Sequence, residues 1–224
     1  MLNQQIRKTI QQIKSSLPTD LNILLEQGAG EISALDIIEQ ARKVGEYLPE
    51  FDLTNQYGKS RTLAELLQSG PLILTFYRGL WCPYCNLQLK AYADRLTDIE
   101  ATGATLVAIS PERPDAFSVL KKSDVSSELI AGIIKDVPFE ILRDKHNVLA
   151  KKMGLAFNLP DAHQRVLRTL GIDVKTLTDD STLTFPDPAT YVVKPSGEIA
   201  WSFVPNNYRK RAEVDEILDA LTNL

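Results

Sequence analysis

Apolar residues recur at helical spacing in the first part of the chain. Over residues 2–16 the apolar positions lie three or four residues apart, as in an amphipathic helix: Ile6, Ile10, Ile13 and Leu17. Two further helical stretches follow, LNILLEQ, which we expect to end at Gly28–Gly30, and a run from Ser33 through LDIIEQARKVGEY. Residues 1–46 are therefore predicted to form an N-terminal helical extension that packs against the rest of the molecule or mediates oligomerisation.

The pattern changes at residue 47. Short, dense, β-prone segments now alternate with helical ones: the strands YLPEFDL, PLILTFY, ATLVAIS and FEILRD, a long helix from Pro83 to Gly103, and the helical HNVLAKKMG. Thr62 and Glu65 form a capping box before LAELLQ. ATYVVKPSGEIAWSFV is typical of a hairpin, and RAEVDEILDALTNL of a closing helix. Residues 47–224 are predicted to form an α/β domain with a central mixed sheet flanked by helices.

Charge and composition exclude several classes of function. The net charge is −4 and both signs are mixed along the chain, so the basic surface of a nucleic-acid-binding protein is not expected. No segment approaches the roughly 20 apolar residues of a membrane span. The N-terminal segment has no apolar core of signal-peptide length, and we therefore expect a cytoplasmic protein.

The candidate chemistry lies in the segment Thr75–Cys85, between a predicted buried strand and a predicted helix. Cys82 falls at the expected N-cap, and Pro83 occupies the first helical position. The free N–H groups and the positive end of the helix dipole would lower the pKa of Cys82, and Arg78 could add a positive charge. Cys85 lies one turn further on, within reach for a disulfide, and should remain closer to an ordinary thiol. One activated and one resolving sulfur are what thiol–disulfide exchange requires.

Two simpler interpretations of the cysteines are available. The pair could be inert core thiols, since free cysteines are often buried. A zinc site would need two more ligands, and only His146 and His163 are available, at a separation unlike that of zinc fingers. We expect neither a metal nor a cofactor.

The segment FYRGLWCPYCNLQL resembles the strand–loop–helix motif of thioredoxin-fold proteins. With LPEFDL, GKSRTLAELL, ATLVAISPE, ILRDKHNVLAKKMG and the hairpin segment, it resembles the peroxiredoxin-like branch of the alkyl hydroperoxide reductase and thiol-specific antioxidant family. The resemblance runs from about Gly45 to the C-terminus. It implies a thioredoxin fold and reduction of hydroperoxides, with Cys82 as peroxidatic and Cys85 as resolving residue. Thioredoxin or a glutaredoxin-type dithiol would recycle the enzyme.

The chain also departs from that family. Gly79 stands three residues before Cys82, where the best-known groups have Thr, and the nearest Thr is Thr75. The family's second active-site Arg, before a late strand, is missing from FPDPATYVV, and CPYC is the dithiol sequence of glutaredoxins.

Three further residues are predicted to contact substrate. Trp81 and Tyr84 flank the cysteines and could shield the thiolate or contact a partner, although packing aromatics would look the same. Pro188 precedes a strand that should face the cysteines, and could be a cis-proline or an ordinary trans turn residue. Arg143 ends a predicted strand near the site, and we expect it to form a surface salt bridge.

Three functions are consistent with these observations. The first is a thiol peroxidase that forms a Cys82–Cys85 disulfide. The second is a thiol–disulfide oxidoreductase without peroxide chemistry, and the third is a non-enzymatic thioredoxin-fold adaptor. For the first we expect a hydroperoxide substrate, a dithiol reductant and a homodimer.

Overall fold

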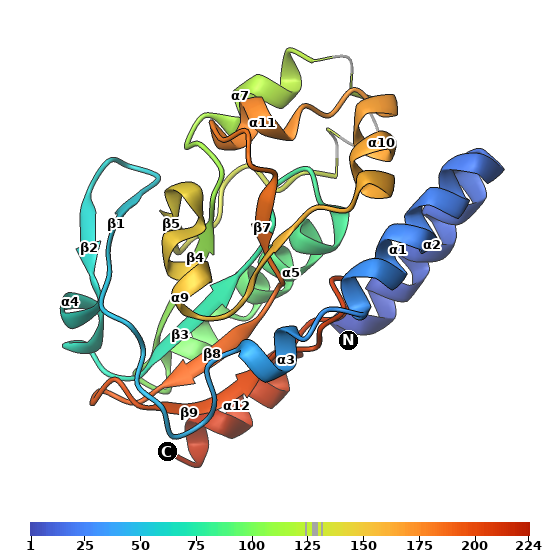
Figure 1. The fold of residues 1–224 in the computed structure, drawn as a ribbon. Coiled ribbons are helices and arrows are strands. Elements are labelled where there is room, and N and C mark those ends of the chain that lie inside the picture. The colour runs from blue at the N-terminus through green and yellow to red at the C-terminus, as the bar shows by residue number, and fades with distance from the viewer. Residues whose placement is uncertain (124, 127–129, 131) are drawn as a thin grey trace.

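A seven-stranded mixed sheet forms the centre of the molecule (Figure 1). The computed structural model describes residues 1–123, 125–126, 130 and 132–224. The strands are arranged in the order β2-β1-β5-β4-β3-β8-β9. Their bounds are β1 Asp52–Asn55, β2 Ser60–Thr62, β3 Leu72–Phe76, β4 Thr105–Ser110, β5 Glu140–Arg143, β8 Thr190–Val193 and β9 Ile199–Phe203. The predicted α/β class and central mixed sheet are thus confirmed.

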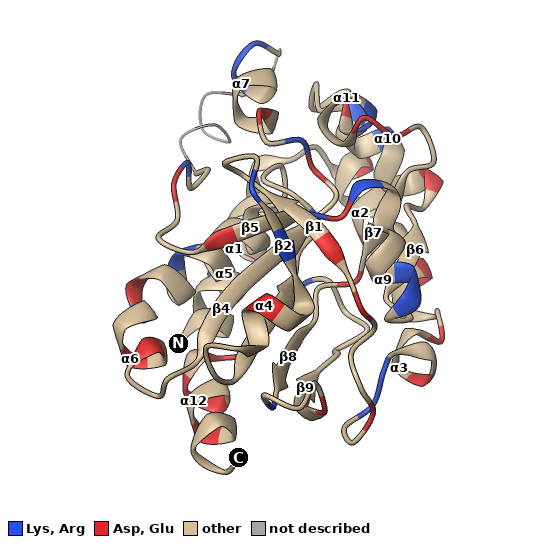
Figure 2. Cartoon of the chain, turned by 90° about the vertical axis from the view of Figure 1, so that its left-hand side faces the viewer, with Lys and Arg blue, Asp and Glu red and all other residues tan. Residues whose placement is uncertain are grey.

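The three middle strands, β5, β4 and β3, run parallel, while the strands on either side of them run antiparallel. All five residues of β3 are buried, as expected for a strand with helices on both faces. In Figure 2 the sheet lies between a group that includes α5, α6 and α12 and another that includes α9 and β7. Strand β3 lies in the middle of the sheet, parallel to β4. Its carboxyl end leads into the loop that precedes α5.

Most predicted helical segments are present, but the structure has more helices than predicted, since α10 (Asp161–Thr169) and α11 (Val174–Thr178) lie in a stretch for which no helix was expected. The predicted long helix is two helices, α5 (Pro83–Asp94) and α6 (Leu96–Glu100), separated at Arg95, whose φ of −117° is not helical. The remaining helical segments after the extension are α4 Leu63–Leu67, α7 Ala116–Lys121, η1 Lys145–Asn147, α9 Val148–Lys152, α10 Asp161–Thr169, α11 Val174–Thr178 and α12 Val214–Thr222. The capping box of Thr62 and Glu65 is present in α4.

The N-terminal extension is helical but differs in its bounds. Its helices are α1 (Leu2–Ser16), α2 (Thr19–Ser33) and the short α3 (Ile37–Gln40). Helix α2 continues through Gly28 instead of ending there. Gly28 faces the buried His163 of α10, and a Cβ atom at Gly28 would lie only 2.3 Å from the His163 ring nitrogen Nδ1. The glycine therefore serves the close approach of two helices.

The extension shares the hydrophobic core of the α/β domain. Leu2, Ile6 and Ile32 belong to the same buried cluster as the strands. Helix α1 packs against α5 and α2 against α10, as Figure 1 shows. The backbone N–H groups of Leu2 and Asn3 donate to the Glu213 carboxylate before α12. A fixed packing role is consistent with these contacts.

A two-stranded ribbon lies outside the main sheet. Strands β6 (Ala156–Asn158) and β7 (Thr184–Pro186) pair antiparallel in a stretch whose sequence shows no clear periodicity. Basic and acidic residues are scattered along the helices and strands of the ribbon in Figure 2, in agreement with the mixed charge pattern. Among the described helices, none has the length and apolar character that crossing a bilayer requires.

Candidate active site

The loop after β3 places Cys82 at the start of α5. Cys82 is the N-cap residue and Pro83 follows as the first helical residue, as predicted. The Cys82 N–H donates to the Gly79 carbonyl at 3.1 Å. From inside the helix, the Asn86 amide donates to the Leu80 carbonyl at 2.6 Å. Helix and loop are thereby tied together, which fixes the direction of the Cys82 side chain.

The Cys82 sulfur is fully buried and accepts a hydrogen bond from Arg78 Nη2 at 3.1 Å. It makes no side-chain capping bond to the helix N–H groups. Hydrogen bonds to this sulfur thus come from the Arg78 guanidinium and the Cys85 thiol and not from the N-terminal amides of α5, although the sulfur still lies at the positive end of that helix. This difference arises because the loop turns Arg78, four residues earlier, back over the sulfur.

Arg78 is itself almost completely buried, with 3% of its surface exposed. Its guanidinium carbon lies 4.1 Å from the ring centre of Tyr208 and 4.8 Å from that of Trp81. These cation–π contacts hold the charge beside the sulfur. Within the described part of the chain, Nε and Nη1 of Arg78 have no hydrogen-bond partner. Two buried donors therefore remain available next to the sulfur.

Cys85 has a guanidinium partner of its own. Arg211, from the segment before α12, donates from Nη2 to the Cys85 sulfur at 3.1 Å. Arg211 is 1% exposed and is held by Gln88 and by the carbonyls of Tyr208 and Lys210. Arg211 was not predicted from the sequence, because 126 positions separate it from Cys85 and no local pattern links the two.

The pKa values of the two cysteines are shifted in opposite directions. Burial opposes ionisation of Cys82, but a hydrogen bond from the Cys85 thiol and the charges of Arg78 and Arg211 lower the pKa of Cys82 well below its usual range. Burial and the neighbouring Cys82 sulfur raise the pKa of Cys85 well above its usual range, although both arginines oppose this. Cys82 is thus the ionised sulfur and Cys85 the protonated one.

Gly79 has a conformation and surroundings that only glycine fits. Its φ is +152°. An added Cβ atom would lie 2.5 Å from both Oε1 of Glu112 and Nε1 of Trp81. This explains physically why the chain has no Thr at this position. Glu112 is buried, accepts from the Leu80 N–H at 2.7 Å, and burial raises its pKa to about 8.

Thr75 belongs to a structural network beneath the sulfurs. Its hydroxyl lies 2.9 Å from that of Thr190 and accepts a hydrogen bond from the Gln88 amide at 2.7 Å. Strands β3 and β8 are thereby linked to α5. Because Thr75 is fully occupied in this network, it does not substitute for the missing threonine hydroxyl beside Cys82.

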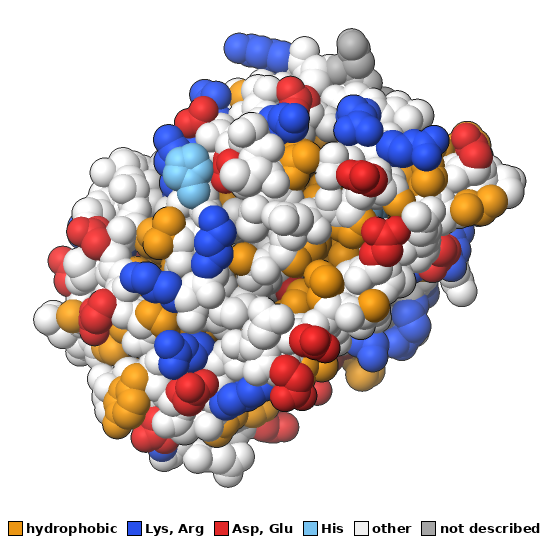
Figure 3. Space-filling model, in the orientation of Figure 1, with side chains coloured by type: hydrophobic (Ala, Val, Ile, Leu, Met, Phe, Trp, Pro, Cys, Tyr) orange, Lys and Arg blue, Asp and Glu red, His pale blue; other side chains and the backbone are white. Residues whose placement is uncertain are grey.

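A groove of about 720 Å³ reaches the site from the surface. Arg78, Trp81, Pro83, Tyr84 and Tyr208 line its inner end, whereas α1, α2 and α10 line its outer walls. Apolar side chains gather in the middle of the face shown in Figure 3, in the region that α10 and the N-terminal helices flank in Figure 1. The N-terminal extension therefore contributes one wall of the access route to the dithiol.

His163 of α10 also lines this groove. Its Nε2 atom is 3.0 Å from the Tyr208 hydroxyl, and the same Tyr208 ring covers Arg78. Burial, Arg78 and Arg209 lower the pKa of His163 to about 3, so its imidazole is neutral at physiological pH. No spacing signal in the sequence connects His163 with Cys82, because the connection runs through Tyr208.

Pro188 is buried two residues before the start of β8 at Thr190. Of the two alternatives, the trans form is found, since none of the described peptide bonds is cis. The neighbouring Ala189 carbonyl accepts from the Phe76 N–H at 2.8 Å, at the end of β3. Among the described residues that line the groove, Trp81 and Tyr84 are present and Pro188 is not. A substrate contact by Pro188 stays a prediction.

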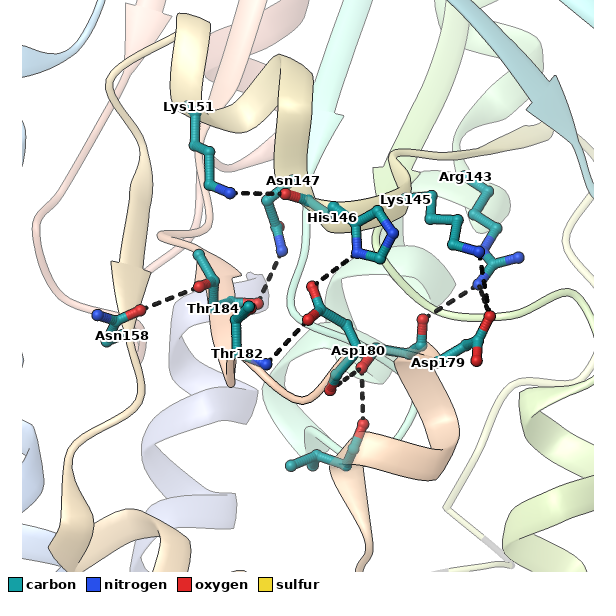
Figure 4. Close-up of polar contacts among 12 residues, drawn as sticks. Arg143, Lys145, His146, Asn147, Lys151, Asn158, Asp179, Asp180, Thr182 and Thr184 are labelled. Carbon is teal, nitrogen blue, oxygen red and sulfur yellow. Dashed lines mark hydrogen bonds and ion pairs between the residues drawn. The ribbon is translucent and has the colours of Figure 1, made fainter.

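A second group of charged residues follows β5 and α11, away from the sulfurs. Figure 4 shows Arg143, Lys145 and His146 directed towards Asp179 and Asp180. Lys145 pairs with the Asp179 carboxylate at 3.2 Å, and Arg143 lies 3.9 Å from the same carboxylate. Arg143 thus takes part in a surface ion pair, as predicted.

Comparison with known proteins identifies relatives of the chain. The model of the AhpC/TSA family matches residues 44–202. A peroxiredoxin of Hyperthermus butylicus is 28% identical over 116 residues, which are 52% of this chain and 47% of that protein. Peroxiredoxin Bcp of Escherichia coli K12 is 21% identical over 113 residues, covering 50% of this chain and 65% of that protein. The match thus spans less than half of the length of the Hyperthermus relative.

Solved structures agree in fold. The peroxidoxin BcpB of Mycobacterium tuberculosis superimposes with a TM-score of 0.55 at 19% identity, covering 81% of this chain and 97% of that one. The reduced 2-Cys peroxiredoxin of Plasmodium vivax gives a TM-score of 0.59 at 18% identity, covering 81% of each chain. The thioredoxin fold is thereby confirmed. Since the family match extends over more than half of its length, the chain belongs to the AhpC/TSA family.

Proposed function

We propose that the protein is a thiol-dependent peroxidase that reduces hydroperoxides at Cys82. The observation that carries this proposal is the Arg78 guanidinium, which touches the Cys82 sulfur at 3.1 Å and, within the described part of the chain, keeps two buried donor atoms without partners. The membership of the AhpC/TSA family supports the same function.

The reaction follows from this geometry. The Cys82 thiolate attacks the terminal oxygen of the hydroperoxide, an S–O bond forms and the O–O bond breaks. Cys82 is oxidised to sulfenic acid, and the other oxygen leaves as an alcohol or as water after taking up a proton. The Nε and Nη1 donors of Arg78 can stabilise the negative charge that develops on the peroxide oxygens. In this role Arg78 compensates for the hydroxyl that Gly79 cannot supply.

Cys85 then completes the cycle. Its sulfur attacks the Cys82 sulfenic acid, the disulfide forms, and water is released. An external dithiol such as thioredoxin or glutaredoxin reduces the disulfide by exchange. We further propose a homodimer in the cytoplasm, with residues 47–224 as the peroxidase domain and residues 1–46 as its helical extension. Trp81 and Tyr84, which line the groove, would contact the substrate.

Thiol–disulfide exchange without peroxide chemistry is the second candidate. Two adjacent sulfurs with opposite pKa shifts favour it, since they suit a dithiol reductase equally well. An adaptor without chemistry would have no reason to bury two guanidinium groups against two thiols.

The test is peroxide consumption by the purified protein with a thioredoxin system. Wild type is expected to consume hydrogen peroxide and an organic hydroperoxide, and Cys82→Ser should reduce the rate to that of buffer. Exchange of disulfide substrates is measured in parallel. A wild-type peroxide rate equal to that of Cys82→Ser, with rapid disulfide exchange, would replace the first candidate by the second.

A further inference from the structure

Arg211 places a second guanidinium group against the pair of cysteines, separate from that of Arg78. Its Nη2 atom contacts the Cys85 sulfur at 3.1 Å, just as Arg78 contacts the Cys82 sulfur. Its other donors are taken: Nε bonds Gln88 at 2.7 Å, and Nη1 bonds the carbonyls of Tyr208 and Lys210. Those three bonds orient the guanidinium plane, so that Nη2 points at the Cys85 sulfur.

Full burial makes this arrangement difficult to explain by packing alone. Arg211 is the largest of the fully buried side chains in the described part of the molecule, and no described carboxylate accepts a hydrogen bond from it. A buried charge is costly unless negative charge lies nearby. The groups that can carry negative charge around it are the two sulfurs and Asp187, whose carboxyl senses both arginines.

The charge balance changes during the proposed cycle. Before reaction, the Cys82 thiolate disfavours ionisation of Cys85. After attack on the peroxide, Cys82 is a neutral sulfenic acid and this repulsion disappears. The charges left beside Cys85 are then Arg211, in contact, and Arg78. Ionisation of the Cys85 thiol therefore becomes easier only after Cys82 has been oxidised to sulfenic acid.

We propose that Arg211 is a positioning residue that activates Cys85 for disulfide formation, the second step of the cycle; the proposal rests on the proposed peroxidase function. In this step the Cys85 thiol loses its proton, its sulfur forms the S–S bond, and the S–O bond of Cys82 breaks. The departing hydroxide takes up a proton and leaves as water, so no further oxidant is consumed. Arg78 serves the first sulfur and Arg211 the second.

Other titratable groups around Cys85 could also affect this step. Tyr77 senses the Cys85 sulfur, and burial raises its pKa well above its usual range. Tyr92, on the same helix as Cys85, senses Arg211, and burial raises its pKa. Burial raises the pKa of Asp187 to about 6, although Arg211 and Arg78 oppose this. Between pH 7 and 9, Asp187 is ionised and both tyrosines remain protonated. Glu112, whose pKa burial raises to about 8, titrates in this range beside the Cys82 loop, so the test relies on the difference in pH midpoint between wild type and the Arg211 variants, which share Glu112.

The test compares the rates of sulfenic acid formation and of disulfide formation in Arg211→Met, Arg211→Lys and the control Lys210→Met. Lys210→Met removes a positive charge from the adjacent, exposed position. One equivalent of hydrogen peroxide is added to the full-length protein between pH 7 and 9, and samples are quenched with dimedone at successive times. Mass spectrometry then quantifies the Cys82 sulfenic acid adduct and the Cys82–Cys85 disulfide.

In Arg211→Met, sulfenic acid should still form, and disulfide formation should slow by on the order of 10- to 100-fold, the effect of one charge-assisted hydrogen bond. The pH midpoint of the second step should move upward. Arg211→Lys should recover part of the rate, and Lys210→Met should behave as wild type. Uniform slowing without a shift in pH midpoint and without recovery by Lys would overturn the proposal and indicate a structural role.

A second variant covers the case in which Arg211→Met does not fold. Gln88→Glu keeps the shape of the Arg211 partner but replaces the amide that donates to Thr75 and places a carboxylate against Nε, which weakens the positive field at Cys85. The shift in pH midpoint therefore distinguishes the charge effect from loss of the bond to Thr75. It should slow disulfide formation and raise its pH midpoint, and wild-type kinetics in this variant would overturn the proposal. Wild type that forms no sulfenic acid would instead overturn the proposed function itself.

Discussion

The dithiol site and the cluster in Figure 4 are both rich in charge but use it differently. At the dithiol, Arg78 and Arg211 are 3% and 1% exposed, and neither donates to a carboxylate among the described residues. In the cluster, Lys145 and Asp179 form an ion pair between side chains that are 49% and 58% exposed. The dithiol site places charge in the core, whereas the Lys145–Asp179 pair of the cluster lies in water.

This difference shows where electrostatic energy is concentrated in the molecule. Exposed ion pairs contribute little, because water and salt screen them. Buried charges are stable only with strong partners, and here the partners are two sulfurs and two aromatic rings. Charge substitutions should therefore have large effects at the dithiol and small effects in the cluster.

The largest effect is expected for Arg78→Met. Loss of the guanidinium removes the hydrogen bond and the charge that lower the pKa of Cys82, so the thiolate should require a higher pH. The rate with hydrogen peroxide at pH 7 should fall by on the order of 100-fold. In wild type, alkylation by iodoacetamide should change little between pH 7 and 9, while in the variant it should rise with pH. Arg78→Lys, which keeps the charge, should lie between the two.

Glu112→Gln should change how stability depends on pH. The pKa of Glu112 is raised from 4.5 to about 8, so between these values the unfolded chain loses this proton while the folded protein keeps it. Stability should therefore fall as pH rises from about 4.5 to about 8, by on the order of a few kcal/mol. The variant should lack this component, which urea unfolding at several pH values would measure. Parallel curves for both proteins would contradict a raised pKa.

The smallest effect is expected for Asp179→Asn. This change breaks the ion pair with Lys145 at the surface, so the urea midpoint and the peroxide rate should match wild type within experimental error. Measurements at low and high salt should show no difference between the two proteins. A peroxide rate reduced as much as in Arg78→Met would remove the distinction between the two regions.

The sequence predicted those features of the site that are encoded locally. Cys82, Pro83 and Cys85 adopt the predicted positions because a buried strand, a short loop and a helix start follow one another along the chain. Arg78 was found for the same reason. The capping box and the hairpin are likewise encoded by local patterns. The thioredoxin fold was predicted from the family resemblance.

Features that depend on distant parts of the chain were not predicted. Arg211 reaches Cys85 through a long-range contact, and Tyr208 links His163 to Arg78 in the same way. Gly28 looked like a helix end, because the need for space beside His163 exists only after α10 has packed. The break at Arg95 also has no glycine or proline to mark it.

The complete burial of both sulfurs separates small reagents from large ones. Each sulfur-bearing residue of the dithiol is 0% exposed, although a groove leads to the arginine in contact with Cys82. A small hydroperoxide fits a groove of this kind, whereas exchange with a partner protein requires direct contact between sulfur atoms. In the proposed cycle, recycling by a protein dithiol therefore requires a local opening that exposes one of the two sulfurs.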